Sequence, residues 1–472
     1  MLEKIFKLKQ NNTTVKTEIL AGLTTFMTMA YIIALNPNLL TGFGAEGTKA
    51  LWNGVFLATC IASAVGMFVM AFLANKPFAL APGMGLNSFF AVVVANIVSI
   101  TGLSYVDSFQ AALCIILIEG ILFFILSIFN IRDKIVDAIP YGVRMGISPA
   151  IGLMLLNIGF GSNAGVYSKD GGPFYVMKDF FGALTPGLAK TNMTDGYSSM
   201  VLTVVTMFIG LFVIIILAHK GVNGAVLFGM LAACVVYWAG EAIFFGTNPF
   251  ASLATASFVP QFKDMADTTL FKFDFKDFIS IGWFTAVSLI ITFCIIDMFD
   301  TIGTLVGTAS RAGMVDKEGN MPNMKEALIS DSVATMVGAV TGTSTVTTFV
   351  ESASGGRTGL TAFTTGILFL ACIFIAPLAA IIPAAATSSA LIYVGILMLG
   401  GLKKVDFEDL SQVAPVALML IAMPISGSIG HGIGLGLITY TVLKVFTGKA
   451  KEVSILTYAI SLLFLVKFFL VV

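Results

Sequence analysis

Long apolar stretches alternate with short polar segments along the whole chain. Residues 51–74, 201–218 and 222–240 carry no charge, and neither do residues 359–402, which Pro383 divides in two. About 20 apolar residues are enough to cross a bilayer as an α-helix. A transmembrane β-barrel would show short strands of alternating polarity instead. The pattern therefore predicts an all-α polytopic membrane protein.

We predict about fourteen transmembrane segments, in two groups of seven. The first group is expected near residues 17–40, 51–74, 79–98, 108–130, 134–160, 198–219 and 221–245. The second is expected near residues 282–310, 327–341, 343–356, 359–382, 383–402, 411–427 and 429–447. Because each group has an odd number of segments, the second runs through the membrane in the opposite sense, as in an inverted repeat. The apolar tail, residues 448–472, either lies in the interface or crosses once more.

Lysine and arginine residues gather in alternate short loops, on one side of the predicted segments. They are Lys4, Lys7, Lys9, Lys16, Lys76, Arg132, Lys134, Lys220, Arg311, Lys317, Lys403 and Lys404. Because such residues are enriched in cytoplasmic loops, this side is predicted to be the cytoplasm and to hold the N-terminus. The longer loops, about 161–197 and 247–281, then face outside. We expect a multi-pass protein of the cell membrane, and the basic start of the chain does not predict a cleavable signal peptide.

Two predicted segments are poor helices, and each is the third of its group. Residues 77–90 (PFALAPGMGLNSFF) contain two Pro and two Gly, and residues 338–356 (GAVTGTSTVTTFVESASGG) contain four Gly among Thr and Ser. Gly, Pro and β-branched Thr disfavour continuous helix. Irregular backbone inside a membrane is tolerated where it is buried in protein or lines a cavity. We therefore expect short extended stretches in segments 3 and 10, beside a substrate site near the membrane midplane.

Acidic residues in these apolar surroundings provide the candidate chemistry. One polar stripe has helical spacing and consists of Asp297, Asp300, Thr301, Thr304, Thr308 and Arg311. A second stripe consists of Thr341, Ser344, Thr345, Thr348, Glu351 and Ser352. An ionisable group at membrane depth costs about 2.5–3.5 kcal/mol on insertion scales, so each acid requires a function or a partner.

Two functions suit these carboxylates. A buried carboxylate accepts two parallel N–H bonds, which predicts a site for a small, flat, polar solute. Burial disfavours the charged form, so one acid is also expected to carry a coupled proton. The structural alternative is that the acids satisfy backbone groups or pair with Arg311 and Arg357. Glu119 is expected to serve packing or interhelical bonding, and Arg144 and His431 are expected to be gate or interface residues.

Composition excludes several other functions. The chain is 57% hydrophobic and 11% charged with zero net charge, so nothing suggests nucleic acid as a partner. The five Cys lie in apolar segments without metal-ligand spacing and are predicted to be small buried hydrophobic side chains. The sequence has no Walker A motif and only two His, His219 and His431, so no Ser/His/Asp set is evident. We expect no enzyme activity, no cofactor and no metal ion.

Four stretches resemble the AzgA-like purine permeases, a branch of the nucleobase–cation symporter-2 (nucleobase/ascorbate transporter) family with the uracil permease fold. They are TEILAGLTTFMTMAYIIALNP, ALAPGMGLNSFF, DMFDTIGTLVG and GTSTVTTFVESASGGRTGLTA. The resemblance implies a core (transport) domain of residues 17–130 and 282–382, and a gate (scaffold) domain of residues 131–246 and 383–447. It also implies proton-coupled import of hypoxanthine, guanine, adenine or xanthine, by an elevator-type or rocking alternating-access mechanism.

The resemblance further implies roles for single residues. The binding Asn, Asp and Glu of the family correspond to Asn87, Asp300 and Glu351. Neighbouring positions of the same motifs complete the expected substrate-binding set: Met84, Thr304 and Val350. The expected proton-coupling residues are Glu351, Asp300 and Asp297.

Two departures from the family pattern leave the preferred base open. Fewer residues separate Ser354 from Arg357 than in most members, and segment 5 contains Arg144 and Pro149. An anion transporter of the sulfate type on the same fold is the alternative, although such a site would use cationic groups rather than two buried acids. Coupling to Na⁺ in place of H⁺ and assembly as a homodimer also remain open.

Overall fold

The computed structural model describes residues 2–129, 139–163, 197–311, 314, 321–349 and 355–470. The chain forms two compact units. Unit 1 comprises Met1–Pro140, Val259–Ala376 and Lys451–Val472, and unit 2 comprises Tyr141–Phe258 and Pro377–Ala450. Within the described residues, ten helical stretches are long and apolar enough to span a membrane, and three shorter apolar helices accompany them. The predicted all-α membrane architecture is confirmed.

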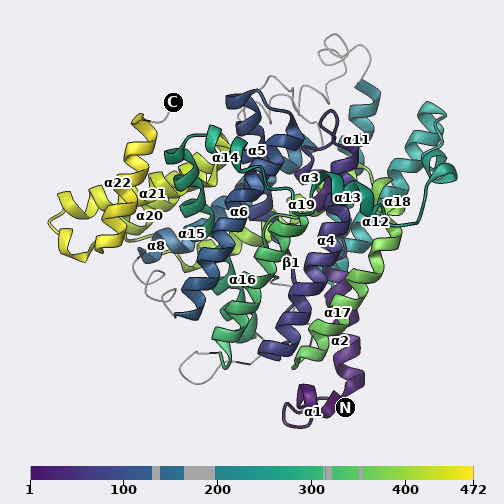
Figure 1. The fold of residues 1–472 in the computed structure, drawn as a ribbon, viewed down its shortest axis with the longest axis horizontal. Coiled ribbons are helices and arrows are strands. Elements are labelled where there is room, and N and C mark those ends of the chain that lie inside the picture. The colour runs from purple at the N-terminus through teal and green to yellow at the C-terminus, as the bar shows by residue number, and fades with distance from the viewer. Residues whose placement is uncertain are drawn as a thin grey trace. The chain divides into compact units, whose positions relative to one another are not determined.

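Unit 1 combines helices with a two-stranded sheet (Figure 1). Its first part contains α1 (Leu2–Phe6), α2 (Val15–Met29), α3 (Ile32–Leu40), α4 (Lys49–Val69) with a π-helical end (Met70–Ala74), β1 (Leu80–Pro82), α5 (Met84–Thr101) and α6 (Tyr105–Ile128). Its second part contains α13 (Phe262–Thr268), α14 (Phe275–Ser280), α15 (Trp283–Arg311), α16 (Met324–Thr341), β2 (Val346–Thr348), α17 (Gly359–Ala371) and α22 (Ile455–Leu470). Helix α16 packs against α4 and α6, and α17 packs against α2 and α4, so the two halves of the sequence meet in this unit.

The two broken segments meet as an antiparallel strand pair. Strands β1 and β2 lie side by side with Ala81 opposite Thr347. Gly83 permits this approach, because a Cβ atom there would lie 2.6 Å from Thr347 Cγ2. Gly342 ends α16 with a φ of 97°, a conformation that glycine adopts without steric cost. The extended stretches predicted in segments 3 and 10 are confirmed.

The first predicted segment, residues 17–40, corresponds to one candidate span, Val15–Leu40, which is divided into two helices. Helix α2 ends at Met29 and α3 begins at Ile32. Pro37 lies inside α3. Its ring has no N–H to donate and crowds the carbonyl group of Ile33, so its effect falls within α3, whereas the break lies nearer the N-terminus, between Met29 and Ile32.

The loop near residues 247–281 contains helices that the apolar pattern did not indicate. Helix α13 packs against α4. Asn53 Nδ2 donates to Asp264 Oδ2 at 2.6 Å, and Gln110 Nε2 donates to Thr268 O at 2.9 Å. These polar contacts attach the second half of the loop to unit 1.

Unit 2 is a helical assembly. It contains α8 (Tyr141–Ile158), α11 (Tyr197–His219), α12 (Ala225–Gly240) with a π-helical end (Glu241–Phe245), α18 (Ala376–Ala380) at its boundary, α19 (Ala384–Met398), α20 (Leu410–Ser426) and α21 (Ile429–Phe446). Helices α8 and α19 cross closely at Gly152 and Gly395, where only glycine fits. A Cβ atom on Gly152 would lie 2.6 Å from Gly395 O, and one on Gly395 would lie 2.7 Å from Gly152 O. Small residues at helix crossings are typical of membrane proteins.

The cysteines and the apolar tail complete the comparison with the expected fold. Four cysteines are buried, namely Cys60, Cys114, Cys234 and Cys372. Cys294 departs from the prediction because it is only partly buried. The tail forms α22, which belongs to unit 1 and packs against α15.

Candidate functional site

A buried carboxylate on α16 organises the polar cluster beside β2. Asp331 is fully buried. Its Oδ1 atom accepts hydrogen bonds from the backbone N–H and the hydroxyl of Thr348, at 2.9 and 3.0 Å. Its Oδ2 atom accepts from the hydroxyl of Thr301 on α15 at 2.7 Å. Because a buried carboxylate needs donors around it, Asp331 fixes β2 and α15 to α16.

Asp331 is not among the residues predicted from the sequence. The sequence indicates Asp331 only as an acidic residue inside an apolar span. Such a residue has either a function or a hydrogen-bonding partner, and the sequence alone does not tell which. Ser330, Ser332 and Thr335 accompany Asp331 in the sequence, but the partners Thr301 and Thr348 that bind its carboxylate come from other elements.

Thr301 lies between two buried acids. Its Oγ1 atom is 2.7 Å from Asp331 Oδ2, 3.3 Å from Asp297 Oδ1 and 2.9 Å from Thr347 Oγ1. A hydroxyl carries one proton, so Thr301 can donate to only one of these oxygens at a time. When Thr301 donates its proton to Asp331, it can form a hydrogen bond with Asp297 only as an acceptor. Such a bond requires a protonated Asp297 carboxyl group. Hydrogen bonds of α15, α16 and β2 therefore depend on which of these oxygens receives the Thr301 proton.

Asp300 lies beside the residue that precedes α5. It is partly exposed. A Cβ atom on Gly83 would lie 3.8 Å from Asp300 Oδ2. The N-terminal end of a helix carries partial positive charge, which stabilises a nearby carboxylate. Asp300 therefore lies near the break in segment 3, at Gly83. Asn87 lies just after this break, on α5.

Asn87 is fully buried on the first turn of α5 and belongs to a network of amides and hydroxyls. Its Nδ2 atom donates to Asn36 Oδ1 at 2.7 Å and to Thr343 O at 3.1 Å. Asn36 Nδ2 donates to the hydroxyls of Thr59 and Thr343, both at 2.8 Å. These contacts assign the Asn87 amide orientation, because a flipped amide would aim its oxygen at two acceptors. Asn36, which is not among the predicted residues, thus orients Asn87.

The network leaves one atom of Asn87 unused. Its Oδ1 atom is buried and has no hydrogen-bond partner among the described residues. The hydroxyls of Ser344 and Thr345, which follow Thr343 in the chain, are also buried and have no hydrogen-bond partner within the described part of the chain. Ser344 also has a φ of 63°, which is uncommon for a residue other than glycine. Buried polar atoms without partners are rare, so these oxygens are candidate ligand contacts.

The other predicted residues divide into two groups. Met84 and Thr304 are buried in unit 1, on α5 and α15. Outside the described residues lie Val350, Glu351, Ser352 and the side chains of Thr308 and Arg311. Before this gap, the N–H of Phe349 donates to Ala79 O at 3.0 Å. Within the described part of the chain, no group of three or more His, Cys, Asp or Glu side chains is arranged to hold a metal ion.

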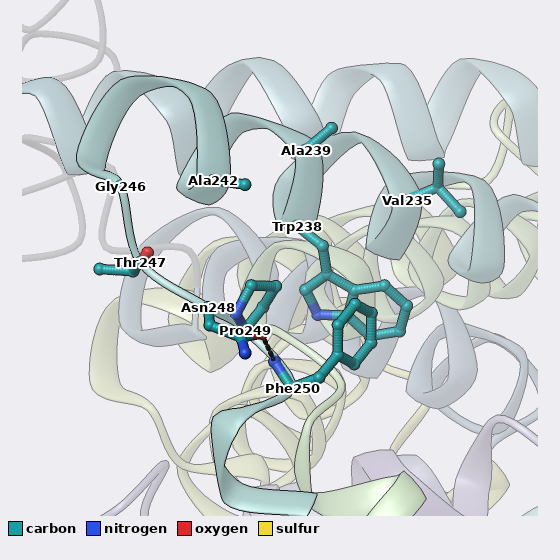
Figure 2. Close-up of a pocket in the computed structure, with 9 residues that line it drawn as sticks. All are labelled: Val235, Trp238, Ala239, Ala242, Gly246, Thr247, Asn248, Pro249 and Phe250. Atoms are coloured by element: carbon teal, nitrogen blue, oxygen red, sulfur yellow. Dashed lines mark hydrogen bonds between the residues drawn. The ribbon is translucent and has the colours of Figure 1, made fainter.

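Unit 2 holds a feature of a different kind, a largely apolar cavity of about 650 Å³ (Figure 2). Its lining consists of Val235, Trp238, Ala239, Ala242, Gly246, Thr247, Asn248, Pro249 and Phe250. The rings of Trp238 and Phe250 meet edge to face with centroids 4.9 Å apart. Figure 2 shows the hydrogen bond of 3.0 Å from the Phe250 N–H to Asn248 Oδ1. No residue of the lining is ionisable, so this cavity is not the carboxylate site that the sequence predicts.

Arg144 and His431, the predicted gate or interface residues, lie in the first turns of helices of unit 2. The Arg144 guanidinium lies over the Tyr141 ring, 5.5 Å from its centroid. The backbone N–H of His431 donates to Ser428 Oγ at 3.4 Å, which caps the start of α21.

Comparison with known proteins gives consistent matches along the whole chain. A family model described as "Permease family" matches residues 16–427. The chain is 36% identical over 471 residues to the adenine permease AdeP of Escherichia coli, covering 99% of this chain and 96% of that protein. It is 36% identical over 473 residues to the guanine/hypoxanthine permease PbuO of Bacillus subtilis, covering 99% and 100%.

A solved structure shares the fold. The transmembrane domain of the cyanobacterial bicarbonate transporter BicA matches with a TM-score of 0.60 at 16% identity, over 90% of this chain and 97% of that one. At 16% sequence identity, this similarity supports a shared fold and nothing about a shared function. It confirms the predicted seven-plus-seven inverted-repeat architecture.

Proposed function

Since this chain belongs to the permease family whose model it matches from residue 16 to residue 427, we propose that it imports purine nucleobases by proton symport. The observation that carries this proposal is the set of hydrogen-bond acceptors near the β1–β2 pair. Asp300 lies beside Gly83, and Asn87 presents an unused carbonyl oxygen. The names of the relatives AdeP and PbuO, an adenine permease and a guanine/hypoxanthine permease, support the substrate class.

Acceptors suit the N–H groups of a purine. Both N–H groups of Asn87 are engaged by Asn36 and Thr343, so Asn87 can meet a ligand only as an acceptor. Asp300 and the predicted residue Glu351 would add carboxylate acceptors. Such a site favours a solute with several N–H groups, and it disfavours sulfate, which would place acceptor against acceptor. The anion-transporter alternative is therefore the weaker one.

The acids of α15 are proposed to carry the coupled proton, together with Glu351. Asp297 contacts Thr301, and Thr301 donates to Asp331, which holds Thr348 of β2. Proton uptake at Asp297 would thus change the hydrogen bonds that position β2. Na⁺ remains the alternative coupling ion.

Alternating access would follow an elevator-type or rocking mechanism. Unit 1 contains the predicted substrate residues and is proposed to act as the transport domain, with unit 2 as the gate. The N-terminus is proposed to face the cytoplasm, and a homodimer is the proposed assembly.

Uptake of radiolabelled hypoxanthine, guanine, adenine and xanthine in a host without purine transporters tests this function. At least one base should accumulate, unlabelled purine should compete, excess sulfate should not, and a protonophore should abolish accumulation. Asp300→Asn, expressed at the same level, serves as the inactive control. Uptake of sulfate without uptake of any purine would overturn the assignment.

A further inference from the structure

Residues 264–271, which we name the α13 segment, are attached by side chains to two other helices of unit 1. Asn53 Nδ2 on α4 donates to Asp264 Oδ2 at 2.6 Å. Gln110 Nε2 on α6 donates to Thr268 O at 2.9 Å. Figure 1 shows α13 beside α4, in agreement with their contacts. Two amide side chains thus hold the α13 segment in place.

The α13 segment also packs directly on α4. Thr269, just after α13, is fully buried. A Cβ atom on Gly54 would lie 2.7 Å from Thr268 Oγ1 and 3.0 Å from Thr269 Cγ2. A side chain at residue 54 would therefore push the α13 segment away from α4.

The same segment closes the C-terminal end of α16. The last four carbonyl groups of a helix have no partner within it. One of them, Val340 O, accepts from the Phe271 N–H at 2.9 Å. Gly342, which caps the helix, packs against Thr269, because a Cβ atom on Gly342 would overlap the Thr269 side chain. The α13 segment thus fixes the place where the chain leaves α16.

The chain leaves α16 directly into the network of Asn87. Thr343 follows Gly342 and is fully buried. Its carbonyl oxygen accepts from Asn87 Nδ2 at 3.1 Å, and its hydroxyl accepts from Asn36 Nδ2 at 2.8 Å. Thr59 Oγ1 lies 2.9 Å from the same hydroxyl. Thr343 therefore orients Asn87 both directly and through Asn36.

Little slack separates the two sets of contacts. The N–H groups of Gly342 and Thr343 both donate to Gly338 O, at 2.8 and 2.9 Å, so the turn moves with the end of α16. N–H···O hydrogen bonds lie between about 2.7 and 3.2 Å, and the bond from Asn87 to Thr343 O already measures 3.1 Å. A small outward shift of Gly342 would therefore weaken the hold on Asn87.

We propose that Asn53 and Gln110 are positioning residues for base binding. They hold the α13 segment against the end of α16. Through Gly342 and Thr343 they set the orientation of the Asn87 amide, without touching the base. This role rests on the proposed function, in which Asn87 presents its carbonyl oxygen to the base.

Hydrogen–deuterium exchange of the purified full chain tests the attachment without any substrate. Asn53→Ala/Gln110→Ala removes both side-chain contacts, so the amides of Phe271 and Thr343 should exchange about ten-fold faster. Gln261→Ala is the matched control, because the Gln261 side chain donates to a backbone carbonyl two residues earlier, at 2.9 Å, ahead of α13. Unchanged exchange at Thr343 would show that the segment does not hold the end of α16 and would overturn the proposal.

Uptake kinetics separate positioning from support of the fold alone. In Asn53→Ala/Gln110→Ala the KM for the transported base should rise about ten-fold, while Vmax per folded molecule stays within about two-fold. Gln261→Ala should match the wild type in both. Faster exchange with an unchanged KM would show a purely structural attachment and overturn the positioning role.

A combination with Asn36→Ala tests the route through Thr343. Both changes act on the orientation of Asn87, so their effects should overlap. The KM of Asn36→Ala/Asn53→Ala/Gln110→Ala should rise by less than the product of the two separate rises. A rise equal to that product would mean that the two act independently, which would overturn the route.

Gly54→Ala carries the test if Asn53→Ala/Gln110→Ala does not fold. It keeps the hydrogen bonds and displaces the α13 segment by contact, so the KM should again rise. Adding Thr268→Ala removes the nearest atom and should restore most of the loss, since the Thr268 hydroxyl bonds Asp264 O within α13 at 2.7 Å. An unchanged KM in Gly54→Ala, or a KM that stays raised in Gly54→Ala/Thr268→Ala, would overturn the proposal.

Transport by the wild type separates the two proposals. If the wild type transports none of the four bases, the proposed function fails and the positioning role falls with it. Exchange at Thr343 then still decides whether the α13 segment holds the end of α16. If the wild type transports a base and the variants keep its KM, only the positioning role fails.

Discussion

Asp331 accepts both the backbone N–H and the hydroxyl of Thr348, at 2.9 and 3.0 Å. Thr348 is the last residue of β2. The end of this strand is thus attached to α16 as well as paired with β1. Because Asp331 also accepts from Thr301, elements of predicted segments 8, 9 and 10 converge on one carboxylate.

Asp331→Ala should destabilise the protein, because it leaves the Thr348 N–H, the Thr348 hydroxyl and the Thr301 hydroxyl without this acceptor. Each unsatisfied buried group costs about 1–3 kcal/mol. The melting temperature of the purified protein should fall by several degrees, as read by a thermal-shift assay. A melting temperature equal to that of the wild type would mean that Asp331 does not hold β2.

Asp331→Asn should separate folding from coupling. The new amide can accept from Thr348 and donate to Thr301, whose single proton then turns to Asp297. We expect a nearly normal melting temperature and base binding, with loss of proton-driven accumulation. Ser332→Ala is the control, since the Ser332 hydroxyl donates to Leu328 O on the same helix at 2.6 Å. Proton-driven accumulation of the base at the wild-type level in Asp331→Asn would show that the Thr301 cluster takes no part in proton coupling.

Asn36→Ala should weaken base binding although Asn36 is not predicted to touch the base. The variant removes the acceptor for one N–H of Asn87, so the Asn87 amide loses its fixed orientation. A loss of one hydrogen bond of about 1.4 kcal/mol corresponds to about ten-fold in affinity, measurable by calorimetry. Thr41→Ala, at the end of the same helix, removes hydroxyl contacts with Pro37 O at 2.7 Å and Asn38 O at 3.3 Å, both within that helix, and should bind normally. Equal affinities in the two variants would refute the orienting role.

The helices and the two breaks could be predicted because their signals are local. Pro82 and Gly83 interrupt segment 3, and Gly342 and the Thr-rich run after it interrupt segment 10. The break between α2 and α3 had no such local signal, because it lies in an apolar run and Pro37 is inside α3.

The hydrogen-bond networks could not be predicted, because their members are far apart in sequence. Asn36 and Thr343 are separated by 307 residues. Asp331 and Glu18 accept hydrogen bonds from Thr hydroxyls and backbone N–H groups, which are too common in a sequence to mark a site. Motifs indicate Asn87, but only its contacts with Asn36 and Thr343 determine which atom of the amide remains available.

The stability of unit 2 should depend on pH through Asp409, which caps α20 by accepting from the Ser411 N–H at 2.8 Å. Hydrogen bonds from the Ser411 side chain and then from its backbone N–H lower the pKa of Asp409 below its ordinary value. A carboxyl whose pKa is lowered by folding adds stability above its unfolded-state pKa of about 3.9 and loses it as the pH falls through the folded value. Asp409→Asn should therefore melt below the wild type at pH 7.

The difference between Asp409→Asn and the wild type should narrow as the pH falls below about 4. Asp406→Asn, in the same loop, is the control for a general effect of charge. A difference in melting temperature that stays constant from pH 7 to below pH 4 would show that the charge of Asp409 contributes nothing to stability.

Asp300 and Glu351 are predicted to play different roles. Asp300→Asn should lose base binding, because an amide cannot accept two N–H bonds through two oxygens. The expected cost of about 1–3 kcal/mol corresponds to roughly ten-fold to a hundred-fold in affinity. Glu351→Gln keeps the shape and loses the charge, so it should bind and exchange base but fail to accumulate it. Wild-type affinity in Asp300→Asn, or full accumulation in Glu351→Gln, would reverse these roles.

Uptake into proteoliposomes that contain only the purified chain tests the central claim most directly. The interior is made alkaline, the outside holds one radiolabelled purine base, and choline replaces Na⁺. The account predicts transient accumulation above the equilibrium level, abolished by a protonophore and unaffected by excess sulfate. Absence of uptake for all four bases, or accumulation that does not depend on the proton gradient, would contradict it.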